Sequence, residues 1–221
     1  EFKNEIILIS KLQHTYLVKL IGRCVKQEEK ILDPIKKNTF DRGIRFNIIE
    51  GIARGLLYLH KYSRLRIITE TSKQVTFVDG GMNPKISDYD MAKIFGSNES
   101  DAKTKRVVGT HGYMLPEYAL KGTVSTKVDV FSFGVLLLIV SGKNDNLIGY
   151  AWKLWNEGNG LELIDSTLDE SYPGNDVVNC IHIGLLCVQD QATDRPSMSD
   201  IVSMLTNETM LLPAPRQPVC F

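Results

Sequence analysis

The chain has 221 residues, of which 43% are hydrophobic and 24% charged, a balance that excludes a disordered or collagen-like polymer. Lysine and arginine number 26, as do aspartate and glutamate, so the formal net charge is zero. Because nucleic-acid-binding proteins usually carry a basic excess, this balance argues against a nucleic acid as partner. No apolar run is long enough to cross a bilayer, so we expect no membrane segment in this chain.

The first quarter of the chain predicts two helices and one strand. Residues 1–13 place apolar side chains at helical spacing, and residues 17–25 are typical of a strand. The polar segment 27–42 is broken by Pro34 and predicts a loop or a poor helix. Residues 45–62 predict a strong amphipathic helix, since apolar side chains recur there every three or four residues, at Phe46, Ile49, Ile52, Ala53, Leu56, Leu57 and Leu59.

The middle of the chain predicts short strands and loops. Within residues 64–90, Gly80-Gly81 indicates a turn and Asn83-Pro84 a breaker. Residues 96–112 are rich in serine, threonine, asparagine and lysine, so we expect a mobile loop there.

The second half of the chain is predicted to be helical. We expect helices over residues 127–141, 146–157 and 176–189, the first of them buried on all sides. A fourth helix opens at Ser197, where Asp200 completes a capping pattern. The tail is irregular because of Pro213, Pro215 and Pro218. This order of elements predicts an α+β fold with a dominant helical lobe.

The cysteines and histidines indicate neither a disulfide framework nor a zinc site. Cys24, Cys180, Cys187 and Cys220 are widely spread, so we expect buried or free thiols in a reducing compartment. The histidines do not combine with the cysteines at zinc-binding spacing. We expect packing or surface roles for His60, His111 and His182.

Five strings, in this order, carry a resemblance: IARGLLYLH at 52–60, MNPKISD at 82–88, GTHGYMLPEY at 109–118, DVFSFG at 129–134 and DRPSM at 194–198. Together they resemble the C-terminal lobe of a eukaryotic protein kinase, most of all the plant receptor-like serine/threonine kinases with cysteine-rich or lectin-type ectodomains. The resemblance covers essentially the whole chain. It implies an N-lobe remnant at 1–42 (the αC helix and fourth strand, with the hinge largely missing), a helical C-lobe at 43–212 and a tail at 213–221.

The resemblance implies structural roles for residues that this sequence retains. Glu5 stands where the family's αC glutamate pairs with the ATP-binding lysine. Asp129 matches the aspartate that anchors the backbone of the catalytic loop, and Thr110 lies in the loop that docks a substrate hydroxyl. Glu117 and Arg195 match a buried ion pair, which serves to fix register more than to stabilise the fold.

The catalytic positions implied by the resemblance have lost their chemistry. The family's catalytic loop falls on residues 69–76, where Lys73 is retained but Thr71 stands at the base position and Thr76 at the second metal-ligand position. A threonine hydroxyl has neither the negative charge nor the pKa to accept a proton at neutral pH. Asp88 matches the Mg²⁺-binding aspartate and remains a candidate metal ligand, with a solvated loop charge as the alternative.

Further losses concern the nucleotide. The chain starts after the place of the family's glycine-rich loop and lysine strand, and its fifth strand and hinge are expected to be deleted between Lys30 and Asp33. Losing a general base costs a factor of about 10²–10⁴ in rate, and losing an electrostatic clamp about 10²–10³. We therefore expect no intact catalytic site and no bound ATP or Mg²⁺, the cofactors of the family.

The expected function is that of a pseudokinase, an inactive signalling or interaction module whose partners are proteins such as active receptor-like kinases. One alternative is an ATP-dependent serine/threonine kinase of which this chain is a fragment, and another is the non-functional product of a decaying gene. The expected location is the cytoplasm, as the intracellular part of a plasma-membrane receptor if the chain is a fragment. Ser97, Ser100 and Thr104 are candidate phosphorylation sites, with an ordinary polar loop as the alternative.

Overall fold

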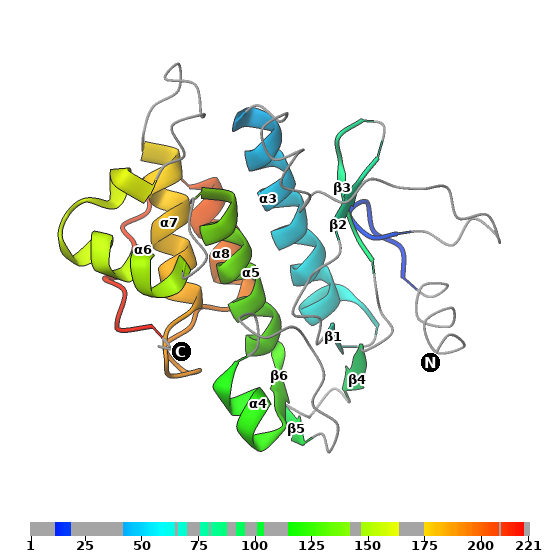
Figure 1. The fold of residues 1–221 in the computed structure, drawn as a ribbon. Coiled ribbons are helices and arrows are strands. Elements are labelled where there is room, and N and C mark those ends of the chain that lie inside the picture. Colours follow the sequence, from blue (N-terminus) through cyan, green and yellow to red (C-terminus); the bar gives the residue numbers. More distant parts are fainter. Residues whose placement is uncertain are drawn as a thin grey trace. The chain divides into compact units, whose positions relative to one another are not determined.

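The computed structural model describes residues 12–18, 42–64, 66–69, 76–79, 81–87, 92–95, 101–103, 115–141, 147–163, 175–207 and 209–218. The chain divides into two compact units, Glu1–Asp129 and Val130–Phe221. Most of the predicted N-lobe remnant lies outside the described residues, and its predicted limits stay predictions. The α+β character is confirmed, with a helical second half and short strands in the first (Figure 1).

The predicted amphipathic helix is confirmed as α3 (Arg42–Leu57), which continues into one π-helical turn, η1 (Tyr58–Tyr62). The wider turn ends where the Ser63 N–H donates to the carbonyl of Tyr58, at 2.8 Å. One face of the helix forms the core of the first unit, because the predicted apolar stripe is buried at Ile49, Ile52, Ala53, Leu56 and Leu59.

The strands of the first unit are each three residues long. Among the described residues they form three antiparallel pairs, β1–β4, β2–β3 and β5–β6. Their bounds are β1 Arg66–Ile68, β2 Thr76–Val78, β3 Pro84–Ile86, β4 Lys93–Phe95, β5 Asp101–Lys103 and β6 Thr123–Ser125.

Two expectations for this region need correction. Residues 101–103 are not loop but strand β5, whose partner β6 follows about twenty residues later in the chain. A strand this short has no measurable periodicity, so its pairing could not be read locally. Pro84 does not break a strand but begins β3, the position at which a residue without an N–H is tolerated.

Residues 12–18 attach to the outer edge of the β2–β3 hairpin. Leu17 forms a parallel bridge with Ile86, the Ile86 N–H donates to the Tyr16 carbonyl at 2.9 Å, and the Val18 N–H donates to the Ile86 carbonyl at 3.0 Å. Helix α3 lies beside this hairpin (Figure 1). The approach is close, because a Cβ atom at Gly55 would lie 2.7 Å from the Ile86 side chain.

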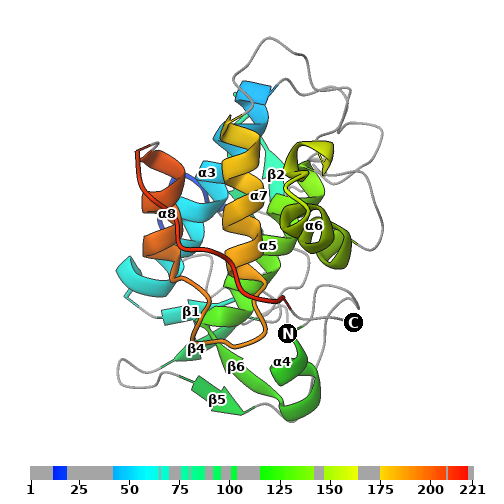
Figure 2. The same cartoon turned by 90° about the vertical axis from the view of Figure 1, so that its left-hand side faces the viewer.

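The second unit is built from helices, and the predicted helices are confirmed. Helix α5 begins in the first unit and continues into the second, and all side chains from Val128 to Leu138 are buried, as expected for a helix covered on all sides. Figure 2 shows α7 between α6 and α8. The bounds are α5 Thr126–Ser141, α6 Leu147–Asn156, η2 Gly160–Leu163, α7 Asn175–Cys187 and α8 Met198–Thr206.

Local signals in the second unit are also confirmed. The Ser197 hydroxyl accepts a hydrogen bond from the Asp200 N–H, and the Asp200 carboxylate accepts one from the Ser197 N–H at 2.9 Å, which completes the predicted cap of α8. Cys180 and Cys187 are buried, whereas Cys24 and Cys220 lie outside the described residues. In the described part of the chain, no helix has the length and apolar character that a membrane crossing requires.

Candidate functional site

The carboxylate of Asp129, in the first turn of α5, holds the residue that follows β1. Asp129 is 0% exposed, and its Oδ1 accepts a hydrogen bond of 2.6 Å from the hydroxyl of Thr69. The backbone N–H of Thr69 donates to the same carboxylate, 3.1 Å from Oδ2. Thr69 is the first position of the predicted catalytic loop, so these contacts agree with the anchoring role predicted for Asp129, which stays a prediction for the rest of the loop.

A third residue, His60 of η1, completes this anchor. Its Nε2 atom lies 2.7 Å from Oδ2 of Asp129. We assign the Nε2 proton from this contact, because a carboxylate can only accept. A buried carboxylate is costly unless donors surround it, and here the Thr69 hydroxyl, the Thr69 N–H and the His60 ring supply them. Of the two roles expected for His60, packing or surface, the buried one is found, and the ring adds a hydrogen bond to Asp129 that was not predicted.

Sequence reasoning could not have found this triad. His60 and Asp129 are 69 positions apart, and Thr69 and Asp129 are 60 apart. The resemblance indicates Asp129 alone, and it gives Thr69 only as the first position of the predicted catalytic loop. One pattern does indicate that His60 is buried. The apolar stripe of α3 continues to Leu59, the residue before His60.

The predicted catalytic loop, residues 69–76, is described only at its two ends. Thr76 begins β2, and its backbone pairs with Ile86 of β3, two residues before Asp88 in the sequence. Thr71, Lys73 and Asp88 lie outside the described residues, and their predicted roles stay predictions. The side chain of Thr76 is not described either.

The turn of the β2–β3 hairpin uses another carboxylate. Oδ1 of Asp79 accepts the backbone N–H groups of Gly81, at 2.9 Å, and Asn83, at 3.0 Å. The bond from the Asn83 N–H is the main reason that the pKa of Asp79 lies below its usual value, and Lys85, 3.4 Å away, contributes a smaller part. The same turn holds Met82 at a φ of 60°. The turn predicted at Gly80-Gly81 is confirmed at Gly81.

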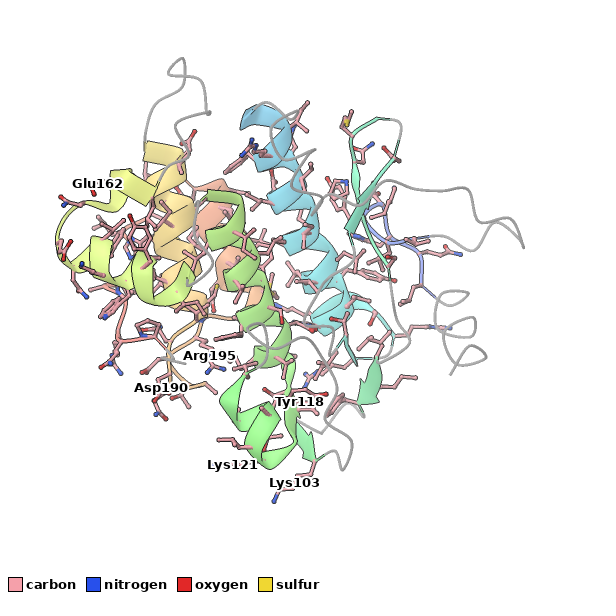
Figure 3. The ribbon with its side chains drawn as sticks, viewed as in Figure 1. Lys103, Tyr118, Lys121, Glu162, Asp190 and Arg195 are labelled. Atoms are coloured by element: carbon pink, nitrogen blue, oxygen red, sulfur yellow. The ribbon has the colours of Figure 1, made fainter. Side chains whose placement is uncertain are left out.

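The two residues of the predicted buried ion pair lie in different units. Glu117 is half-buried in the first turn of α4 (Pro116–Lys121). Arg195 follows α7 and is only 2% exposed. Its Nε donates to the Gln189 carbonyl at 2.6 Å and its Nη2 to the Asp190 carbonyl at 2.8 Å, and Figure 3 shows it beside Asp190. The burial of Arg195 agrees with a structural role, while its pairing with Glu117 stays a prediction.

The other residues named from the sequence cannot be placed. They are the αC-position glutamate, the substrate-docking threonine and the three candidate phosphorylation sites. All five lie outside the described residues: Glu5, Ser97, Ser100, Thr104 and Thr110.

Comparison with known proteins identifies the family. Residues 1–205 match the protein kinase domain. The chain is 48% identical, over 248 aligned positions and 100% of its length, to cysteine-rich receptor-like protein kinase 10 of Arabidopsis thaliana. It is 51% identical, over 99% of its length, to the G-type lectin S-receptor-like serine/threonine-protein kinase B120 of the same plant. It spans 37% of the first relative and 29% of the second. This chain therefore belongs to the protein kinase domain family, and its sequence is of the plant receptor-like kinase type.

Proposed function

We propose that this chain is a catalytically inactive kinase domain that acts as a protein-interaction module in receptor-like kinase signalling. The main support for this proposal is that the predicted catalytic loop keeps its anchor but not its base. The entrance of the loop is fixed by the buried Asp129 anchor, yet the base position two residues later is occupied by Thr71. The fold thus keeps the support of the catalytic loop without the group that would deprotonate an alcohol.

The donor set also fits the family's cofactors poorly. Protein kinases hold two Mg²⁺ ions with an aspartate and an asparagine, whereas this sequence offers Asp88 with a threonine at position 76. We therefore derive no reaction step through Mg²⁺ or ATP.

The expected losses around the nucleotide receive support from the comparison. The alignment with the first relative spans 248 positions although this chain has 221 residues, so it contains gaps in this chain. Such gaps agree with the expected deletion of the hinge strand, whose backbone holds adenine in the family.

The folded cores that this chain retains are consistent with a role in binding other proteins. Both units have buried apolar cores of their own, so the chain can present a folded surface without turnover. The relatives are named receptor-like kinases, and we propose active receptor-like kinases as partners and the cytoplasmic side of the plasma membrane as the location. Ser97, Ser100 and Thr104 would then be sites at which such a partner adds phosphate.

Nucleotide binding tests the proposal directly. Thermal unfolding is measured with and without saturating Mg²⁺–ATP, for the purified chain and for the kinase domain of cysteine-rich receptor-like protein kinase 10. Phosphate transfer to a serine- and threonine-rich peptide is measured for the same two proteins. A ligand at one hundred times its Kd stabilises a protein by about 2.7 kcal/mol. We expect Mg²⁺–ATP to stabilise the relative's kinase domain by this amount and to leave the stability of this chain unchanged. Transfer by this chain that is lost in Asp88→Ala would establish the alternative of an active kinase.

Interaction is tested in a second assay with purified proteins. The chain is immobilised and titrated with the kinase domains of the two relatives named above, and we expect saturable binding to at least one. Failure to bind either domain by a chain that unfolds cooperatively would contradict the interaction role. A chain without a cooperative transition would favour the alternative of a non-functional product.

A further inference from the structure

Residues 209–218 of the C-terminal tail, which we call the strap, are held to the second unit by several hydrogen bonds. The strap lies beyond the residues that match the kinase domain, 1–205. It follows α8 in the sequence and runs back across α7, as the red segment in Figure 2 shows. Halfway along, the carbonyl of Pro213 accepts a hydrogen bond of 2.8 Å from Nε2 of His182, whose ring lies 4.6 Å from that of Trp155 of α6.

The far end of the strap is bonded to residues 189–195, the loop between α7 and α8, which we call the Arg195 loop. Nη1 of Arg216 lies 2.9 Å from both carboxylate oxygens of Asp194. The Arg216 N–H donates to Oε1 of Gln189 at 2.7 Å. One residue further, the Asp190 N–H donates to the carbonyl of Gln217 at 3.3 Å.

The same loop is held from within by Arg195. Its guanidinium donates to the carbonyls of Gln189 and Asp190 and lies 5.5 Å from the centre of the Phe131 ring, within the range of a cation–π interaction. The Gln189 side chain joins the two sets of bonds, because its Nε2 donates to the Leu186 and Asp194 carbonyls while its Oε1 accepts from the strap.

The strap bonds differ in what they contribute. The Arg216 side chain is 74% exposed, so its ion pair with Asp194 is a weak contact on its own. Gln189, by contrast, is 3% exposed, so an Oε1 atom without its donor would carry the cost of an unsatisfied buried acceptor. Lifting the strap therefore disturbs the residue whose carbonyl receives the Arg195 guanidinium.

We propose that the strap is a positioning element for Arg195. With the strap docked, Gln189 and Asp190 present their carbonyls to the guanidinium. With the strap released, the Arg195 loop opens locally while the helices stay folded. All of these contacts lie within the second unit, and they do not depend on whether the chain binds a nucleotide.

Hydrogen exchange in the full chain tests this proposal with a graded set of variants. Arg216→Ala removes the ion pair, and Arg216→Pro also removes the N–H that Gln189 accepts. Leu211→Ala, at a side chain that is 95% exposed in the same strap, is the matched control. Exchange is followed at the amides of residues 189–195, at the Nε–H of Arg195, and at the amides of α3 in the other unit as reference.

We expect exchange in the Arg195 loop to rise by about two- to fivefold in Arg216→Ala and by about tenfold in Arg216→Pro, with Leu211→Ala and α3 unchanged. Arg216→Lys keeps the charge and the N–H, so it should restore most of the protection. A loop in Arg216→Pro that exchanges as slowly as in Leu211→Ala would overturn the proposal. So would an equal rise in α3, because that result would mean a global loss of stability.

Discussion

Replacing Thr69 with valine should weaken the buried anchor by a calculable amount. The change keeps the side-chain volume close to that of threonine but removes the hydroxyl that donates to Asp129 at 2.6 Å. A hydrogen bond to a charged group contributes about 1.5–3 kcal/mol, and here the acceptor is fully buried, so no water replaces the lost donor. For a chain of this size the loss corresponds to a melting temperature lower by about 3–12 °C. The Thr69 N–H and His60 still hold Asp129, so the fold should survive.

Urea unfolding followed by circular dichroism measures this difference, with Thr206→Val as the matched control. The Thr206 hydroxyl donates only to the carbonyl of Val202, at the exposed end of α8, so its loss should cost no more than about 1 kcal/mol. Equal stability of the two variants would refute the reasoning, because the Thr69 hydroxyl would then add nothing to a carboxylate that already has its other donors.

Two further predictions concern helix packing and pH. Gly134→Ala should destabilise the chain by about 1–3 kcal/mol in the same unfolding assay, because the new Cβ would lie 2.5 Å from the Cβ of Cys187 on α7, whereas Gly160→Ala meets nothing closer than 3.7 Å and should be nearly neutral. Burial lowers the pKa of both His14 and His182, and Lys85 lowers that of His14 further. Near and below pH 6.5 these two histidines therefore bind more protons in the unfolded chain than in the folded one. The free energy of unfolding should fall as the pH is lowered from 7.5 to 5.5. A His14→Gln/His182→Gln variant with the same pH dependence as the parent would contradict this origin.

The sequence predicts best where the determinants are local. The cap of α8 needs only Ser197 and Asp200, three positions apart, and the burial of α5 follows from its unbroken apolar composition. Strand β5 escaped prediction because its three residues become a strand only through pairing with β6. Local propensity gives no information on such a partner, since the stabilising hydrogen bonds belong to two distant segments.

The site shows the same division between local and distant determinants. Asp129 could be indicated by a motif around it, but nothing near His60 or Thr69 specifies that their side chains meet its carboxylate. The hydrogen bonds of Arg216 to Gln189 and Asp194 could not be predicted from the sequence either. A proline-rich tail is typical of irregular structure, and its composition does not indicate which residues it packs against.

The retained anchor has a physical explanation that does not depend on catalysis. Asp129 lies without exposure inside the first unit, and removing one partner of a buried charged group costs about 3–5 kcal/mol because the other partner is left without compensation. Marginal stability makes such a loss a large share of the total for a domain. A side chain that serves only as a base is under no comparable constraint, because it can change without leaving a buried charge unpaired. The contact between Asp129 and His60 is therefore expected to persist in any folded variant of this domain, whether or not the variant turns over, and this anchor reports on folding rather than on turnover.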